Sequence, residues 1–115
     1  MKTSKKDFEE FKKSFLYWAD RLFCPYRIDF FHTKLRDNYA EIFVDEYGKC
    51  ATVKYNSELD KVDYEARPTP ENGGKHEAIH LLLHRLVWLA DQRFIGKDEP
   101  QEEWERLVRI LEKVL

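Results

Sequence analysis

The residues best able to do chemistry form one short run, His76-Glu77-Ala78-Ile79-His80, which is an HExxH motif. Two histidines four positions apart project from one face of a helix, so both imidazoles can reach one zinc ion. Glu77 is offset around the helix from His76, where it can accept a proton from water. The spacing therefore predicts a zinc site with His76 and His80 as metal ligands and Glu77 as the general base.

A catalytic zinc site needs a third protein ligand and an open position. The candidates are the acidic residues near the start of the last predicted helix: Glu99, Glu102, Glu103 and Glu105. Glu103 lies nearer the centre of that helix's apolar stripe than Glu105 does. The helical wheel mildly favours Glu103, and the residue pattern alone leaves both open.

Other polar residues are expected to play lesser roles. His84 continues the face of His76 and His80, but the ends of this trio lie about 12 Å apart along the helix axis, which is too far for one ion. We expect His84 to pack or to support the site, and His32 to be structural. Tyr55 and Tyr64 could donate a hydroxyl to a developing oxyanion, although a core or interface role is the commoner one for tyrosine.

The hydrophobic pattern predicts an α+β fold that would position the motif. An amphipathic N-terminal helix spans residues 5–23, and strands span 26–33, 39–45 and 50–55. Turn residues at 37–38 and 45–49 suggest a three-stranded antiparallel meander. A loop covers 57–74, with a short helical turn near 59–64. The central helix runs over 75–94, and the C-terminal helix runs from about Pro100 to Leu115.

Composition and charge narrow the class of protein. The 115 residues fit one domain, 1–115, and 43% apolar residues can build its core. A net charge of -2 gives no support to a broad nucleic-acid-binding face. No apolar run is long enough for a membrane span or a secretory signal. Cys24 and Cys50 form no CxxC pair and read as free thiols, so we expect a cytoplasmic protein.

The chain resembles the minimal zincin, gluzincin-like metallopeptidases, and more narrowly the small metallopeptidases of phages and prophages. It is distantly similar to SprT-like and ImmA/IrrE-type domains. The segments that carry the resemblance are 39–45, 50–53, 76–83 and 105–112. The family implies a helix, a small sheet, the HExxH helix and a C-terminal helix that provides a glutamate ligand. The resemblance thus assigns zinc to His76, His80 and Glu105, with Glu77 as the catalytic base; the long loop 57–74 departs from the family's usual tight approach to the motif.

The leading hypothesis is a zinc metallopeptidase that cleaves peptide bonds in a peptide or protein substrate. The alternative is a catalytically silent zincin-fold module that binds or regulates, for example a phage factor acting on a host protein. A third hypothesis is an α+β interaction domain without metal. Glu77 argues for the first hypothesis over the second, because a structural zinc site has no need of a general base.

Overall fold

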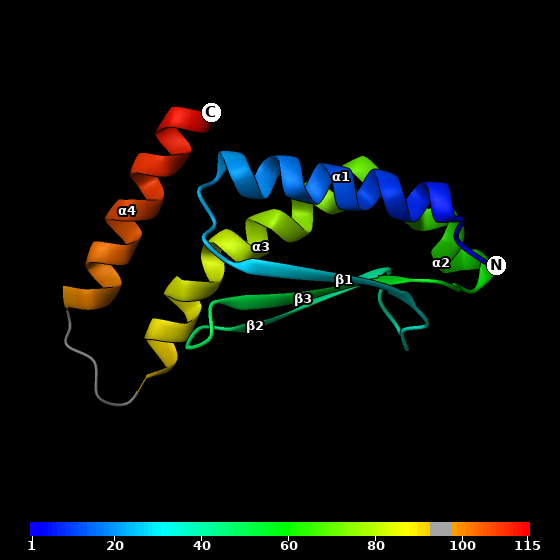
Figure 1. The fold of residues 1–115 in the computed structure, drawn as a ribbon, viewed down its shortest axis with the longest axis horizontal. Helices are drawn as coiled ribbons and strands as arrows, with labels where there is room; N and C mark the ends of the chain where they lie inside the picture. The colour runs from blue at the N-terminus through cyan, green and yellow to red at the C-terminus, as the bar shows by residue number, and fades with distance from the viewer. Residues whose placement is uncertain (93–97) are drawn as a thin grey trace.

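The computed structural model describes residues 1–92 and 98–115 and has the predicted α+β class. Its elements are α1 (Lys5–Arg21), β1 (Arg27–Thr33), β2 (Ala40–Asp45), β3 (Cys50–Asn56), α2 (Lys61–Ala66), α3 (Pro70–Asp91) and α4 (Asp98–Val114). Figure 1 shows α1 and α3 on the same side of the sheet, with α4 standing at the far end of α3. None of the helices in the described ranges has the length and apolar character needed to cross a membrane.

The predicted antiparallel meander is wrong, because the sheet is mixed. Its strand order is β1-β3-β2, with β1 parallel and β2 antiparallel to β3. The predicted hairpin between β2 and β3 is confirmed, and its turn is held by the Asp45 carboxylate, which accepts the N–H groups of Tyr47 and Gly48. The first connection, residues 34–39, does not join neighbouring strands. It carries the chain past the position that β3 later fills.

The side chain of Asn56, at the end of β3, explains how this crossing is held. Asn56 is 1% exposed and bonds the backbone of the crossing segment at Leu35 and Asn38. Its Oδ1 also accepts the N–H of Glu58. A buried amide whose polar atoms are all used fixes the local path of the chain, because leaving those atoms unpaired would be costly. The central strand therefore anchors the loop between its two neighbours.

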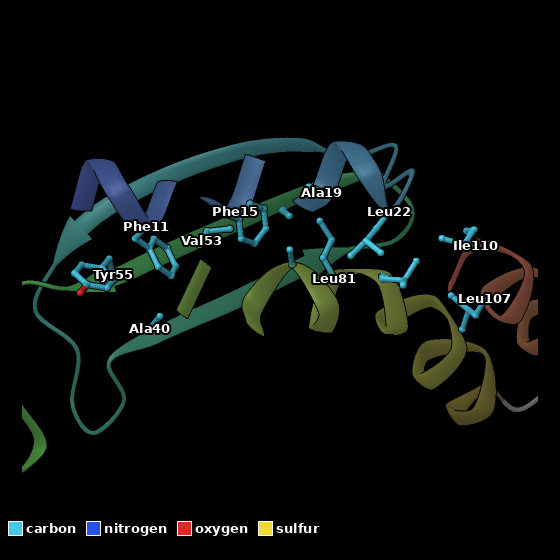
Figure 2. Close-up of a cluster of buried hydrophobic side chains, with 13 residues drawn as sticks. Phe11, Phe15, Ala19, Leu22, Ala40, Val53, Tyr55, Leu81, Leu107 and Ile110 are labelled. Carbon is cyan, nitrogen blue, oxygen red and sulfur yellow. The ribbon is translucent and has the colours of Figure 1, made fainter. Parts of the chain in front are cut away.

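One face of the sheet and the helices above it form the core (Figure 2). Alternate residues of β3 point into this core, and α1 and α3 cover them with residues at helical spacing. Members of the cluster are Phe11, Phe15, Ala19, Leu22, Ala40, Ala51, Val53, Tyr55, Ala78, Leu81, Leu82, Leu107 and Ile110. The opposite face of the sheet is open, and Phe31 and Phe43 are more than half exposed there. The molecule thus has two layers, and α4 contributes Leu107 and Ile110 to the end of the cluster.

The central helix begins earlier than predicted. Residues 70–74, which we expected to be loop, form the first turn of α3, with Thr69 as N-cap and Pro70 in the first turn. The Gly73-Gly74 pair suggested a loop but lies inside the helix and is buried. A Cβ atom on Gly74 would sit 2.5 Å from the backbone oxygen of Phe11, so glycine is needed for α1 and α3 to approach.

The remaining boundaries lie close to the predicted ones. The helical turn expected within the 57–74 loop is confirmed as α2, and α4 begins two residues before Pro100. The structure ends α3 at Asp91, and the predicted end at Phe94 lies outside the described residues.

Candidate metal and hydrolase site

The HExxH residues lie in the first half of α3, as predicted. His76 and His80 are exposed, and their Nε2 atoms are 3.1 Å apart. Glu77 is only 6% exposed and lies on the side of α3 that faces the protein interior. Two nitrogens held at about 2.0–2.1 Å by one tetrahedral zinc lie about 3.3 Å apart. The two rings are thus hydrogen-bonded to each other at a separation close to that of two zinc-bound nitrogens.

Glu77 meets a tyrosine that the sequence analysis did not single out. Burial raises the pKa of Glu77, while His80, His76 and the Tyr39 hydroxyl act to lower it. In turn, burial and the neighbouring Glu77 carboxylate raise the pKa of Tyr39 to about 12. The Tyr39 ring also lies against Gly73, one turn before Glu77. Tyr39 thus keeps its proton near neutral pH and can hold the Glu77 carboxylate in place.

These residues open onto a groove of about 780 Å³ between α3 and β2. One wall is the continuous segment 38–44, which includes most of β2. The other wall is α3, through His76, Glu77, His80, Leu83, His84 and Val87. Because β2 lies at an edge of the sheet, its backbone borders the groove along its length. The site is therefore elongated rather than a closed pocket.

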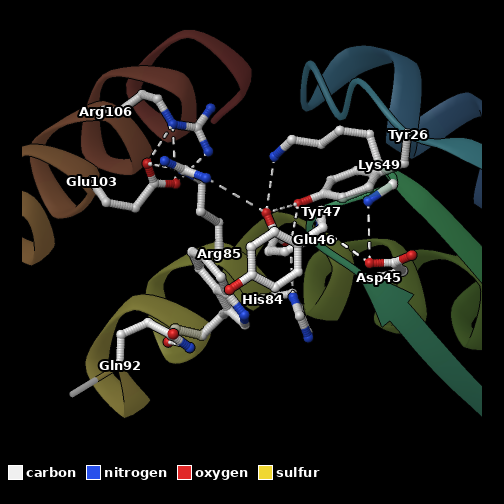
Figure 3. Close-up of polar contacts among 12 residues, drawn as sticks. Tyr26, Asp45, Glu46, Tyr47, Lys49, His84, Arg85, Gln92, Glu103 and Arg106 are labelled. Atoms are coloured by element: carbon white, nitrogen blue, oxygen red, sulfur yellow. Dashed lines mark hydrogen bonds and ion pairs between the residues drawn. The ribbon is translucent and has the colours of Figure 1, made fainter. Parts of the chain in front are cut away.

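The sequence also did not point to Glu46, which bonds His84 in the wall of the groove. Glu46 lies in the β2–β3 turn and is 5% exposed. Its carboxylate accepts hydrogen bonds from the Tyr26 hydroxyl at 2.6 Å, from Lys49 Nζ at 3.0 Å and from His84 Nδ1 at 2.8 Å (Figure 3). Burial acts to raise the pKa of Glu46, but these hydrogen bonds outweigh it and leave the pKa lowered. His84 thus lines the groove and is hydrogen-bonded to an ionised carboxylate.

Arg85 extends this cluster to α4. Its guanidinium lies 3.7 Å from Glu46 and 3.6 Å from Glu103, which is 5% exposed. Arg106, one turn after Glu103, donates to the same carboxylate at 2.9–3.0 Å. Glu103 is therefore paired with two arginines, and its pair with Arg85 connects α4 to α3.

The structure does not bring Glu105 to the histidines. Glu105 is exposed on α4 and is not part of the groove wall. It lies roughly 200° around the helix from Glu103, which faces α3. Across residues 1–92 and 98–115, no three His, Cys, Asp or Glu side chains come together as a metal site. The histidine pair thus has no third protein ligand among the described residues.

The other singled-out residues lie elsewhere. His32 stacks on Phe8 with ring centroids 4.9 Å apart and bonds the Thr3 hydroxyl, so its predicted structural role is confirmed. Tyr55 is a core residue. Tyr64 packs under the Arg67 guanidinium at 3.7 Å. Cys24 and Cys50 are free and half-buried, as expected.

Comparisons with known proteins leave the site to be judged on its geometry. No protein-family model matches the chain, and no curated protein or solved structure matches it significantly.

Proposed function

We propose that this protein is a zinc-dependent hydrolase that cleaves peptide bonds. The observation that carries the proposal is the convergence of His76 and His80 Nε2, 3.1 Å apart, beside buried Glu77 in an elongated groove. A spacing close to that of two zinc-bound nitrogens makes His76 and His80 the residues that would hold the ion. When bound, zinc acts as a Lewis acid and allows water to serve as a nucleophile near neutral pH.

The chain's own residues supply the proton transfers. Glu77 is positioned next to the histidine pair to accept a proton from the attacking water and to pass it to the leaving amine. Tyr39, which lines the groove together with Glu77, is placed to restrain this carboxylate.

An extended peptide is the substrate that best fits the groove. Backbone groups along the free edge of β2 can pair with a peptide strand, which gives affinity without requiring one sequence. Apolar residues on both walls, among them Ile42, Val44 and Leu83, can receive alternate side chains. This mode supports an unfolded segment or a short peptide as the substrate rather than a small polar molecule.

Two finer statements accompany the proposal. The chain order of helix, strands, HExxH helix and C-terminal helix supports a minimal zincin-like arrangement, although its sheet is mixed. The two free cysteines support a reducing, cytoplasmic setting.

A second candidate function is a zincin-like binding or regulatory module. The observation that favours it is that the described residues bring only two metal-type donors together. A site that remains incomplete until a partner arrives would bind peptide without cleaving it.

The test combines metal content with activity. Purified protein should hold about one zinc per chain, and His76→Ala with His80→Ala should abolish it. Zinc should raise the melting temperature of the wild type and not of that double variant, because only the folded state binds. Glu77→Gln should keep the zinc but lower the cleavage rate of a denatured protein or peptide library about 10²- to 10⁴-fold.

Each outcome separates the hypotheses. Full zinc retention in the double histidine variant contradicts the metal site. Equal cleavage by wild type and Glu77→Gln removes Glu77 as the base. A zinc-loaded wild type that binds peptides yet cleaves none favours the binding module.

A further inference from the structure

We infer that His84 is a substrate-binding residue that holds the peptide backbone two residues away from the cleaved bond, with Glu46 as its positioning residue. The inference rests on the proposed function and names a contact that the HExxH motif does not provide. It starts from the place of His84, one helical turn beyond His80 on the same wall of the groove.

Glu46 fixes the orientation of the His84 ring. The Glu46 carboxylate can only accept, so His84 Nδ1 must carry the proton in their 2.8 Å hydrogen bond. Nε2 lies on the opposite side of the ring and has a lone pair when the ring is neutral. Glu46 is itself held by Tyr26 and Lys49 (Figure 3). The ring is thus locked on one side and offers one hydrogen-bond acceptor on the other.

The spacing of His84 from His80 matches the repeat of an extended peptide. Four residues of α-helix advance about 6 Å. Two residues of a strand advance about 6.6 Å, and peptide groups two residues apart point the same way. The N–H and C=O of one strand residue point to the same side. A residue two places from the one with the reacting carbonyl therefore presents its own backbone N–H on the side of His84 Nε2.

The direction of β2 supports this alignment. Tyr39, just before β2, lies beside Gly73 and lines the groove with Glu77, and Glu46, just after β2, bonds His84. The strand therefore runs beside α3 from Glu77 to His84, and a peptide lying along β2 passes both. Around His84 the walls are apolar, through Val44, Leu83 and Val87, so a hydrogen bond made there is partly shielded from water.

Two replacements of His84 separate its two hydrogen bonds. His84→Asn keeps an amide donor near Nδ1 for Glu46 but is too short to reach the groove. His84→Gln extends its amide to the position of Nε2 and retains an acceptor there. The assay uses a peptide cut by the wild type, identified from a digest of denatured casein, together with versions trimmed by two residues at either end.

His84→Asn should raise KM for the full peptide up to about tenfold with kcat nearly unchanged. This is the effect of losing one hydrogen bond that is equally strong in the bound substrate and in the transition state. His84→Gln should recover most of that affinity. On the peptide trimmed at the His84 side, wild type and His84→Asn should have the same KM. Zinc content should match in all three proteins, and the melting temperature of His84→Asn should match that of the wild type.

The contrary results are distinct. The wild type cleaves peptides in two of these results. If His84→Asn then has the wild-type KM on every peptide, or if its KM rises equally on full and trimmed peptides, the inference is wrong and the proposed function stands. Loss of zinc in His84→Asn also overturns it, because His84 would then be a ligand. If the zinc-loaded wild type cleaves no peptide, the proposed function fails and the inference falls with it.

Discussion

A single buried carboxylate, Glu46, links the turn of the sheet to the groove. Its side chain is 1% exposed, whereas its cationic partners Lys49 and Arg85 are about two-fifths exposed. Those partners can turn to water if the carboxylate is lost, which limits the cost. The pKa of Glu46 is lowered in the folded state, so the carboxylate stabilises the fold above its ordinary pKa of about 4.3. That stabilisation is lost as the pH falls through the lowered value.

We therefore predict that Glu46→Gln reduces the free energy of unfolding by about 1–3 kcal/mol at pH 7. The difference from the wild type should shrink as the pH drops below about 4 and through the lowered pKa of folded Glu46, because the wild-type side chain then becomes neutral. Urea denaturation at the two pH values measures this, with exposed Glu9→Gln as the control. If Glu46→Gln loses as much free energy of unfolding in acid as at neutral pH, the charge of Glu46 is not the cause of the loss.

The two glutamates of α4 that compete for the zinc site have different surroundings. Glu103 is buried between Arg85 and Arg106, and Glu105 is exposed. A ligand role for Glu105, implied by the resemblance, requires α4 to turn on α3. We predict that Glu103→Gln lowers the melting temperature, because two arginines lose a buried partner.

Glu105→Gln should leave the melting temperature of the metal-free protein unchanged. If Glu105 is the third ligand, as the resemblance implies, this variant should also lower zinc affinity at least tenfold. Competition with a metal indicator dye measures that affinity in both variants. If zinc binds Glu105→Gln as tightly as wild type, Glu105 is not the third ligand. If only Glu103→Gln loses zinc, and does so at an unchanged melting temperature, Glu103 is the third ligand, as the helical wheel favours.

At the scale of elements, the helices and strands themselves were largely predictable. Periods of 3.6 and 2 in the apolar residues gave the type of every long element. The strand pairing was not predictable, because an alternating strand looks the same beside a parallel or an antiparallel neighbour. The early start of α3 was hidden by Gly73 and Gly74, whose usual place is a loop and whose role here is contact with α1.

This contact predicts that alanine substitutions at the two adjacent glycines change the stability by different amounts. In an open helix, Gly→Ala stabilises by about 1 kcal/mol. At Gly74 the new Cβ would meet backbone atoms of Phe11 at 2.5 Å and Phe15 at 2.8 Å, so we expect Gly74→Ala to destabilise by about 1–3 kcal/mol. At Gly73 the nearest atom is 3.1 Å away on the movable ring of Tyr39, and Gly73→Ala should be close to neutral. Thermal denaturation compares the two; a Gly74→Ala protein as stable as wild type contradicts the close approach.

At the scale of the molecule, the groove lies where the two layers meet at the sheet edge. The sequence located the α3 side of it, because His76, Glu77 and His80 are neighbours in the chain. It could not locate Tyr39, which lines the same groove just before β2, or Glu46, which bonds His84 from the β2–β3 turn. Both lie more than 30 positions away from the motif. Local spacing predicts which residues share a face of a helix. The residues on the opposite wall of the groove depend on the order of the strands in the sheet.

The placement of β3 between strands that precede it in the chain also sets an order of assembly. The β2–β3 hairpin closes across a four-residue turn, 46–49, whereas β1 pairs with β3 only after residues 34–49 have looped out. Local contacts form faster than distant ones, so we expect the hairpin first and β1 afterwards. Pulse-labelled hydrogen exchange during refolding should find backbone amides at the β2–β3 ladder protected before those of β1; simultaneous protection would refute a sequential path. Until β3 emerges during synthesis, α1 and β1 lack the strand that completes their layer, and the Phe30-Phe31 segment remains open to association with other chains.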